Sequence, residues 1–200
     1  MDVMTNSTAM IVSYIGFFYV TALLLRFLLQ IAKADFYNPV SQSIVKITNP
    51  PVLIFRRLIP GYKGIDFSTL ILAIILEGIG LCALVSIYGG DIPPISMIVT
   101  WSVVGIVLFI INIYFFAIIG SIVMSWVMML SGNNNPHPML QLIWQLTEPV
   151  MAPLRKVLPN MGGMDFSPMV IIFGSYIIVD ILEQTFSISP AVKAVLFGVS

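Results

Sequence analysis

Long apolar runs alternate with proline-rich polar stretches along this chain. The first run covers residues 9–32 and contains one charge, Arg26; the second covers residues 68–88 and contains Glu77. A helix needs roughly 20 mainly apolar residues to cross the hydrocarbon core of a bilayer. These two runs, and another at residues 168–187, are therefore predicted to be membrane-spanning helices.

The polar stretch that follows the first run recurs 99 residues later without a gap. The first copy of the identical positions is Pro39, Gln42, Ile44, Thr48, Pro50, Arg56, Pro60, Gly64, Asp66, Phe67 and Ser68, and the second is Pro138, Gln141, Ile143, Thr147, Pro149, Arg155, Pro159, Gly163, Asp165, Phe166 and Ser167. Such self-similarity at a fixed offset indicates an internal repeat. The pattern predicts one repeat over residues 1–94 and a second over residues 95–200.

An unbroken apolar run covers residues 95–130. As one helix it would be about 54 Å long, against about 30 Å of hydrocarbon. The repeat aligns the first span with residues 107–130, so residues 95–106 are an extra segment, either an interfacial helix or an extension of the span. Trp101 in this segment suits a membrane–water boundary.

The predicted fold is therefore an all-α integral membrane protein with four transmembrane helices in two tandem hairpins. Each hairpin has a linker of short interfacial helices, at residues 33–67 and 131–167, and a short helix at residues 190–198 ends the chain. The first linker holds Lys33, Lys46, Arg56, Arg57 and Lys63, the second holds Arg155 and Lys156, and the opposite side has only Lys193. The positive-inside rule places both linkers in the cytoplasm and both termini outside. The hairpins are then parallel repeats related by a pseudo-two-fold axis along the membrane normal.

Each linker carries the same set of polar and proline residues. The set comprises Thr48, Pro50, Arg56, Arg57, Asp66 and Ser68 in the first copy, and Thr147, Glu148, Pro149, Arg155, Lys156, Asp165 and Ser167 in the second. The Thr-x-Pro sequences predict the start of a helix, preceded by another short helix at residues 40–47 or 139–146. Each Asp opens the next span, and we expect it to pair with the basic residues of its own linker. The motif either seats a hairpin at the membrane surface or binds a partner or lipid.

Four charged residues lie inside the predicted spans. Arg26 and Glu77 are placed at similar depth, so they are expected to pair. Asp180 and Glu183 are three residues apart and share one helix face, and no Lys or Arg is expected to reach their depth. Two interpretations remain open for these acids. They either face a polar interior or the outer water, or they line a path for cations or protons.

Composition limits the possible functions. Hydrophobic residues make up 58% of the chain and charged residues 9%, the mean hydropathy is +1.02, and the formal net charge is zero. Direct nucleic-acid binding is therefore not expected. The single cysteine, Cys82, excludes an internal disulfide, and the single histidine, His137, lies between two prolines in a turn-rich segment. We find no catalytic constellation, phosphate loop or metal cluster, and predict neither an enzyme nor a cofactor. The N-terminal region has no basic residue, so the first run is expected to be retained rather than cleaved.

The linker motif resembles the YggT family of small integral membrane proteins. The closer copy runs from Leu146-Thr147-Glu148-Pro149 through Pro153-Leu154-Arg155-Lys156 to Asp165-Phe166-Ser167-Pro168, whereas the first copy has Asn49, Ile54 and Thr69 at three of these places. The resemblance covers the whole chain and implies a bacterial inner-membrane protein. It also implies links to osmotic or potassium stress tolerance, to cell-envelope organisation or, in plastids, to cytochrome haem attachment.

Three functional hypotheses follow. The first is a non-enzymatic assembly, adaptor or osmotic-stress-tolerance factor that acts through unidentified membrane proteins. The second is a channel or transporter component, linked to potassium or protons, that uses the intramembrane acids as a homo-oligomer. The third is a cytochrome or haem assembly factor, for which His137 is the sole support in the sequence.

Overall fold

The computed structural model describes residues 3–62, 64–131, 137–158 and 165–199. Within these ranges the chain forms seven α-helices and no β-strand. The helices are α1 (Val3–Ile31), α2 (Pro39–Leu58), α3 (Phe67–Ile87), α4 (Ile95–Ser131), α5 (Pro138–Val157), α6 (Ser167–Thr185) and α7 (Pro190–Lys193). Four of them, α1, α3, α4 and α6, are long and apolar enough to cross a membrane. The predicted all-helical class and the number of spans are thereby confirmed for the described residues.

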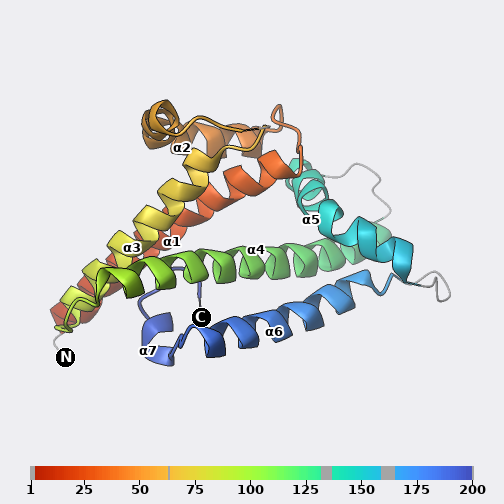
Figure 1. The fold of residues 1–200 in the computed structure, drawn as a ribbon. Helices are drawn as coiled ribbons and strands as arrows, with labels where there is room; N and C mark the ends of the chain where they lie inside the picture. Colours follow the sequence, from red (N-terminus) through yellow and green to blue (C-terminus); the bar gives the residue numbers. More distant parts are fainter. Residues whose placement is uncertain (1–2, 63, 132–136, 159–164, 200) are drawn as a thin grey trace.

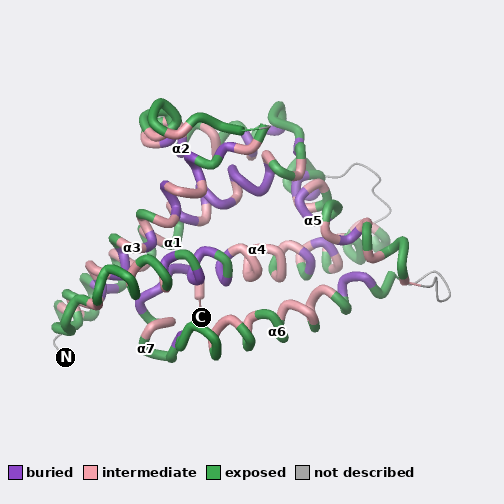
Figure 2. The backbone as a smooth tube through the Cα atoms, viewed as in Figure 1, coloured by how far each residue is buried: buried purple, intermediate pink, exposed green. Residues whose placement is uncertain are grey.

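The membrane helices pack in chain order. Figure 1 shows α1 and α3 side by side, α4 crossing near one end of that pair, and α6 lying along α4. The linker helix α2 packs on α1 and α3, whereas α5 packs mainly on α4. Buried side chains are concentrated in α1, α3 and the first half of α4, whereas α6 is exposed or half-buried beyond its first two residues (Figure 2). In a bilayer such an exposed apolar helix faces lipid or another protein.

Residues 95–106 extend the following span. They belong to α4, which continues from Ile95 to Ser131 without a break, so the second of the two alternatives for this segment is correct. Trp101 lies in this extension, and its indole N–H donates to the carbonyl of Phe186 at 3.3 Å, which ties α4 to the end of α6.

Each linker forms one long helix where two short ones were predicted. Thr48 and Thr147 lie inside α2 and α5, and neither caps a helix start. Their hydroxyl groups donate to backbone carbonyls one turn earlier, those of Ile44 and Ile143, at 2.7 and 2.9 Å. Proline removes one backbone bond and favours a kink, but the helix continues on both sides because its residues pack on the spans beneath it.

The C-terminal helix is shorter than predicted. Helix α7 ends at Lys193, and the amides of Val195 and Leu196 then make tight i→i−3 bonds to Val192 and Lys193. These turns direct the last residues away from a helical path and into the space between the membrane helices. Val195, Leu196 and Phe197 are buried there. An apolar segment that is sheltered by other helices does not need to continue as a helix of its own.

Candidate functional site

The first ion-pair cluster joins the end of α2 to the start of α3. Asp66 precedes α3, is only 2% exposed, and forms a salt bridge with Arg56. The Ser68 hydroxyl donates to the other carboxylate oxygen of Asp66. Burial by itself would raise the pKa of Asp66, but the hydrogen bonds from Ser68 and Arg56 outweigh it and hold the pKa below its usual value. The carboxylate is therefore ionised and fixes the junction between linker and span.

The second cluster repeats this arrangement at the surface. The Arg155 guanidinium donates to Asp165 at 2.8 Å and to Glu148 at 2.8 Å, and the Ser167 amide donates to Asp165 at 2.9 Å. Asp165 is 40% exposed, and the bonds from Arg155 and Ser167 outweigh its burial and lower its pKa. The prediction that each Asp pairs with a base of its own linker is confirmed in both copies. Ser167 is the first residue of α6, and the bond from its amide to Asp165 fixes the start of that helix.

Arg26 does not pair with Glu77, contrary to the prediction. Its Nη1 atom donates to Thr48 Oγ1 at 2.9 Å and to Asn49 Oδ1 at 2.8 Å, both on α2. Long basic side chains near the end of a membrane helix extend toward the polar interface. Arg26 therefore contacts the linker above it and leaves Glu77 deeper in the helix pair.

Glu77 is bound by the C-terminal segment. It is fully buried in α3, and its Oε1 atom accepts the backbone N–H of Phe197 at 2.8 Å. Oε2 has no hydrogen-bond partner among the described residues. The carbonyl of Gly198 in turn accepts a bond from the Asn112 side chain of α4 at 2.9 Å. No sequence pattern indicated this contact, because 120 residues separate the two partners.

Glycines make room for the C-terminal segment on three helices. A Cβ atom added to Gly16 of α1 or Gly80 of α3 would lie 2.1 Å from the Phe197 ring. On α4, a Cβ at Gly105 would lie 3.1 Å from Leu196 and 3.4 Å from Glu77 Oε1. Real Cβ atoms do not approach other atoms at 2.1 Å, so the Phe197 ring would have to shift to admit a larger residue at Gly16 or Gly80. We call Gly16, Gly80 and Gly105 the glycine notch.

The two acids of α6 have separate partners. Lys193 of α7 forms a salt bridge with Glu183 at 2.6 Å, so the expectation that no base reaches this depth is wrong. Gln184 donates to Asp180 at 2.9 Å within α6. Beside Glu183, a cavity of about 240 Å³ between α4 and α6 is lined in part by Asn112 and Ser175.

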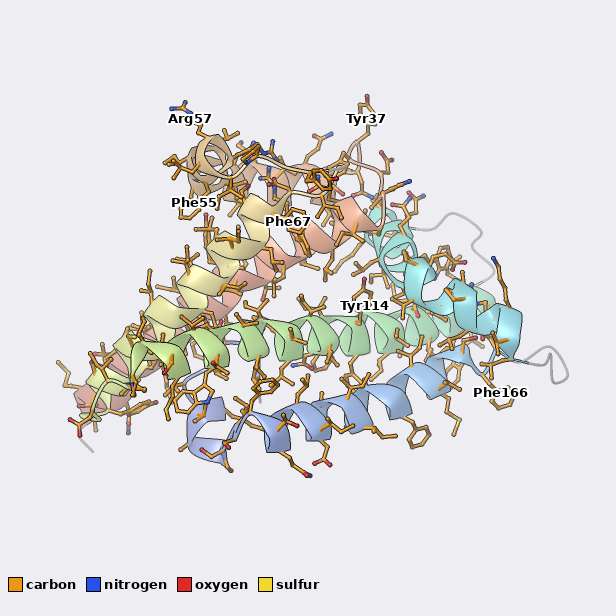
Figure 3. The ribbon with its side chains drawn as sticks, in the orientation of Figure 1. Tyr37, Phe55, Arg57, Phe67, Tyr114 and Phe166 are labelled. Carbon is orange, nitrogen blue, oxygen red and sulfur yellow. The ribbon has the colours of Figure 1, made fainter. Side chains whose placement is uncertain are left out.

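The remaining motif residues occupy helix ends and interiors. Pro50 and Pro149 lie inside α2 and α5. Arg57 and Lys156 are exposed in the last turns of these helices and make no ion pair in the described part of the chain. Figure 3 shows Arg57 pointing away from the membrane helices, whereas Phe67 and Tyr114 point among them. The second-copy residues Pro159 and Gly163 lie outside the described residues, as does Lys63.

His137 caps a helix. Its Nδ1 atom accepts the Met139 amide at the start of α5, at 3.3 Å. No group of three or more potential metal ligands occurs among the described residues. His137 therefore has a local structural role at the start of α5.

Comparison with known proteins identifies relatives over most of the chain. A family model described as CCB3/YggT matches residues 5–87 and again residues 100–186. An uncharacterized protein of Pseudomonas aeruginosa is 40% identical over 160 residues, which are 80% of this chain and 79% of that protein. The uncharacterized protein YggT of Escherichia coli is 33% identical over 176 residues, which are 86% of this chain and 87% of that protein. No solved structure matches the chain.

Proposed function

This chain belongs to the CCB3/YggT family, and we propose that it is a non-enzymatic inner-membrane protein that works by binding partner proteins. In this proposal its role is that of an assembly or osmotic-stress-tolerance factor. The spans form two parallel hairpins, the linker helices α2 and α5 face the cytoplasm, and both termini face the periplasm.

The accessible surface of the linker helices carries this proposal. The last turns of α2 expose Leu53, Ile54 and Leu58 beside the unpaired Arg57 (Figure 3). An exposed helix with apolar residues and a basic end suits docking at the membrane surface. By contrast, the buried Glu77 already accepts the Phe197 amide, and the half-buried Glu183 already pairs with Lys193. The linker helices are therefore the part of the described structure that we expect a partner to contact.

The test places a photo-crosslinking amino acid at Arg57 and, separately, at Lys156 in cells. A third position, Tyr176 on the exposed face of α6, is the control for lipid-facing collisions. We expect a discrete partner adduct from the linker positions that is absent from position 176. In chains without the crosslinking amino acid, charge reversal of both Arg57 and Lys156 should impair growth at high osmolarity. Adducts that are identical at all three positions, or unchanged growth of the reversed variant, would contradict the proposal.

A second candidate function is ion or solute handling, favoured by the cavity between α4 and α6, whose mainly apolar lining includes the polar residues Asn112, Ser175 and Glu183. Its test is ion flux in liposomes that contain only the purified protein, wild type beside a Glu77→Gln, Asp180→Asn, Glu183→Gln variant. Flux that the triple change abolishes would support this function and weaken the adaptor proposal. Absence of flux from correctly folded protein would remove it.

A further inference from the structure

The two repeats differ strongly in the charge of their linkers. Residues 26–68 contain six Lys or Arg and two Asp or Glu, whereas the aligned residues 125–167 contain two of each. Orientation by the positive-inside rule would be served by basic residues in either linker. Because the excess of basic over acidic residues is confined to the first repeat, orientation in the membrane does not explain it.

Substitutions at two aligned positions produce this difference within the ion-pair clusters. In the second repeat Glu148 and Asp165 both bind Arg155. In the first repeat Asn49 stands in place of Glu148, so Arg56 has the carboxylate of Asp66 alone. The second repeat has Ser125 where the first has Arg26. The first cluster therefore has one more base than acid, and the second has one more acid than base.

Arg26 is a buried cation bound by neutral acceptors. It is 7% exposed, and its hydrogen bonds within the described residues go to a hydroxyl and an amide oxygen of α2. Burial of a charge is unfavourable unless it is compensated, and the acid that interacts electrostatically with Arg26 is Asp66, which forms its salt bridge with Arg56. A guanidinium has five N–H donors, of which the bonds to α2 engage one nitrogen. Arg26 lies five residues before the end of α1 at Ile31, or about 8 Å along the helix.

A cavity lies next to this cation. Its volume is about 310 Å³, and its lining residues are Phe36, Gln42, Val45, Lys46 and Asn49. Asn49 is thus shared between the cavity wall and Arg26. Asp35 is the acid next to the lining residue Phe36 in sequence. Its carboxylate accepts the backbone amide of Tyr37 at 2.8 Å. The cavity therefore exposes the ammonium group of Lys46 and the carboxamide of Asn49 to a ligand, and the guanidinium of Arg26 lies behind Asn49.

We propose that this cavity binds the phosphate group of an anionic lipid headgroup, with Lys46 and Gln42 as donors. Arg26 supplies positive charge behind Asn49, whereas the second repeat has Ser125, Gln145 and Glu148 at the places of Arg26, Lys46 and Asn49. The lining also includes the apolar residues Phe36 and Val45, which suit the apolar part of a lipid. This site is independent of whether partner proteins bind the linkers.

The experiment compares lipid retention by the full-length protein in detergent, measured by native mass spectrometry with equimolar phosphatidylglycerol and phosphatidylcholine. Wild type should retain phosphatidylglycerol at least about fivefold over phosphatidylcholine, the factor expected for one basic group at an anionic surface. Lys46→Gln should reduce this preference about fivefold. Asn49→Glu, which introduces the acid of the second repeat, should also abolish it. The matched change Glu148→Asn in the second repeat should not reduce it.

Each alternative outcome is decisive. Equal retention of the two lipids by wild type, or equal loss in the Glu148→Asn and Asn49→Glu variants, would overturn the proposal. Inorganic phosphate that displaces phosphatidylglycerol at millimolar concentration would show that the site takes free phosphate and not a lipid. If Asn49→Glu fails to fold, as judged by its melting temperature, Lys46→Gln alone decides, because the Lys46 side chain makes no ion pair in the described part of the chain.

Discussion

The contact between Phe197 and the glycine notch predicts a specific pattern of stability changes. In a Gly80→Ala variant the new Cβ would meet the Phe197 ring at 2.1 Å, so the ring has to move. Overpacking of this kind costs typically about 1–3 kcal/mol in free energy of unfolding. Truncating the ring in Phe197→Ala, at a position only 5% exposed, costs about 3–5 kcal/mol.

The double variant separates this contact from general damage. With the ring removed, the alanine at position 80 fills part of the vacated space. The double variant should therefore be less destabilised than the two single changes predict together, by about 1–2 kcal/mol. The measurement is unfolding of the purified protein in mixed detergent micelles, followed by far-ultraviolet circular dichroism at increasing denaturing detergent.

Gly174→Ala on α6 provides the matched control. An added Cβ there meets nothing within 4 Å, so the change should be neutral or gain up to about 1 kcal/mol from helix propensity. Strictly additive costs in the Gly80 and Phe197 double variant would refute the reasoning. A Gly80→Ala variant that is as stable as Gly174→Ala would do so as well.

Three further predictions concern buried and paired charges. Glu77→Gln keeps an acceptor for the Phe197 amide and should be tolerated better than Glu77→Leu, by about 1–3 kcal/mol in the same unfolding assay. Because the folded pKa of Asp66 is lowered, its stabilisation is present above the unfolded pKa of about 4 and is lost as pH falls further; wild type should therefore lose stability in acid more steeply than Asp66→Asn. Arg56→Ala, which leaves a buried carboxylate without its guanidinium, should destabilise more than Arg155→Ala, whose partners are exposed and whose pairs contribute about 0.2–1 kcal/mol each. Equal melting temperatures for the two arginine variants would contradict that ranking.

Local sequence determined the helices and the linker ion pairs. Runs of about 20 apolar residues have to satisfy their backbone within a helix when they are in lipid, so α1, α3 and α6 follow from composition and length. The ion pair of Arg56 with Asp66 and that of Arg155 with Asp165 follow from the repeat, because each pair lies ten residues apart in a motif that occurs twice. The family was likewise indicated by the same motif.

The tertiary structure alone decided which groups meet across the helices. Sequence placed Arg26 and Glu77 at similar depth, but depth does not determine the direction in which a side chain extends; α2 and the C-terminal segment each provide a nearer partner. Local motifs also suggested helix starts at Thr48 and Thr147, where packing on the spans keeps each linker helix continuous through its prolines. The return of Phe197 into the glycine notch joins residues more than 100 positions apart. Periodicity along a chain cannot specify such a contact, because it depends on how three helices are arranged in space.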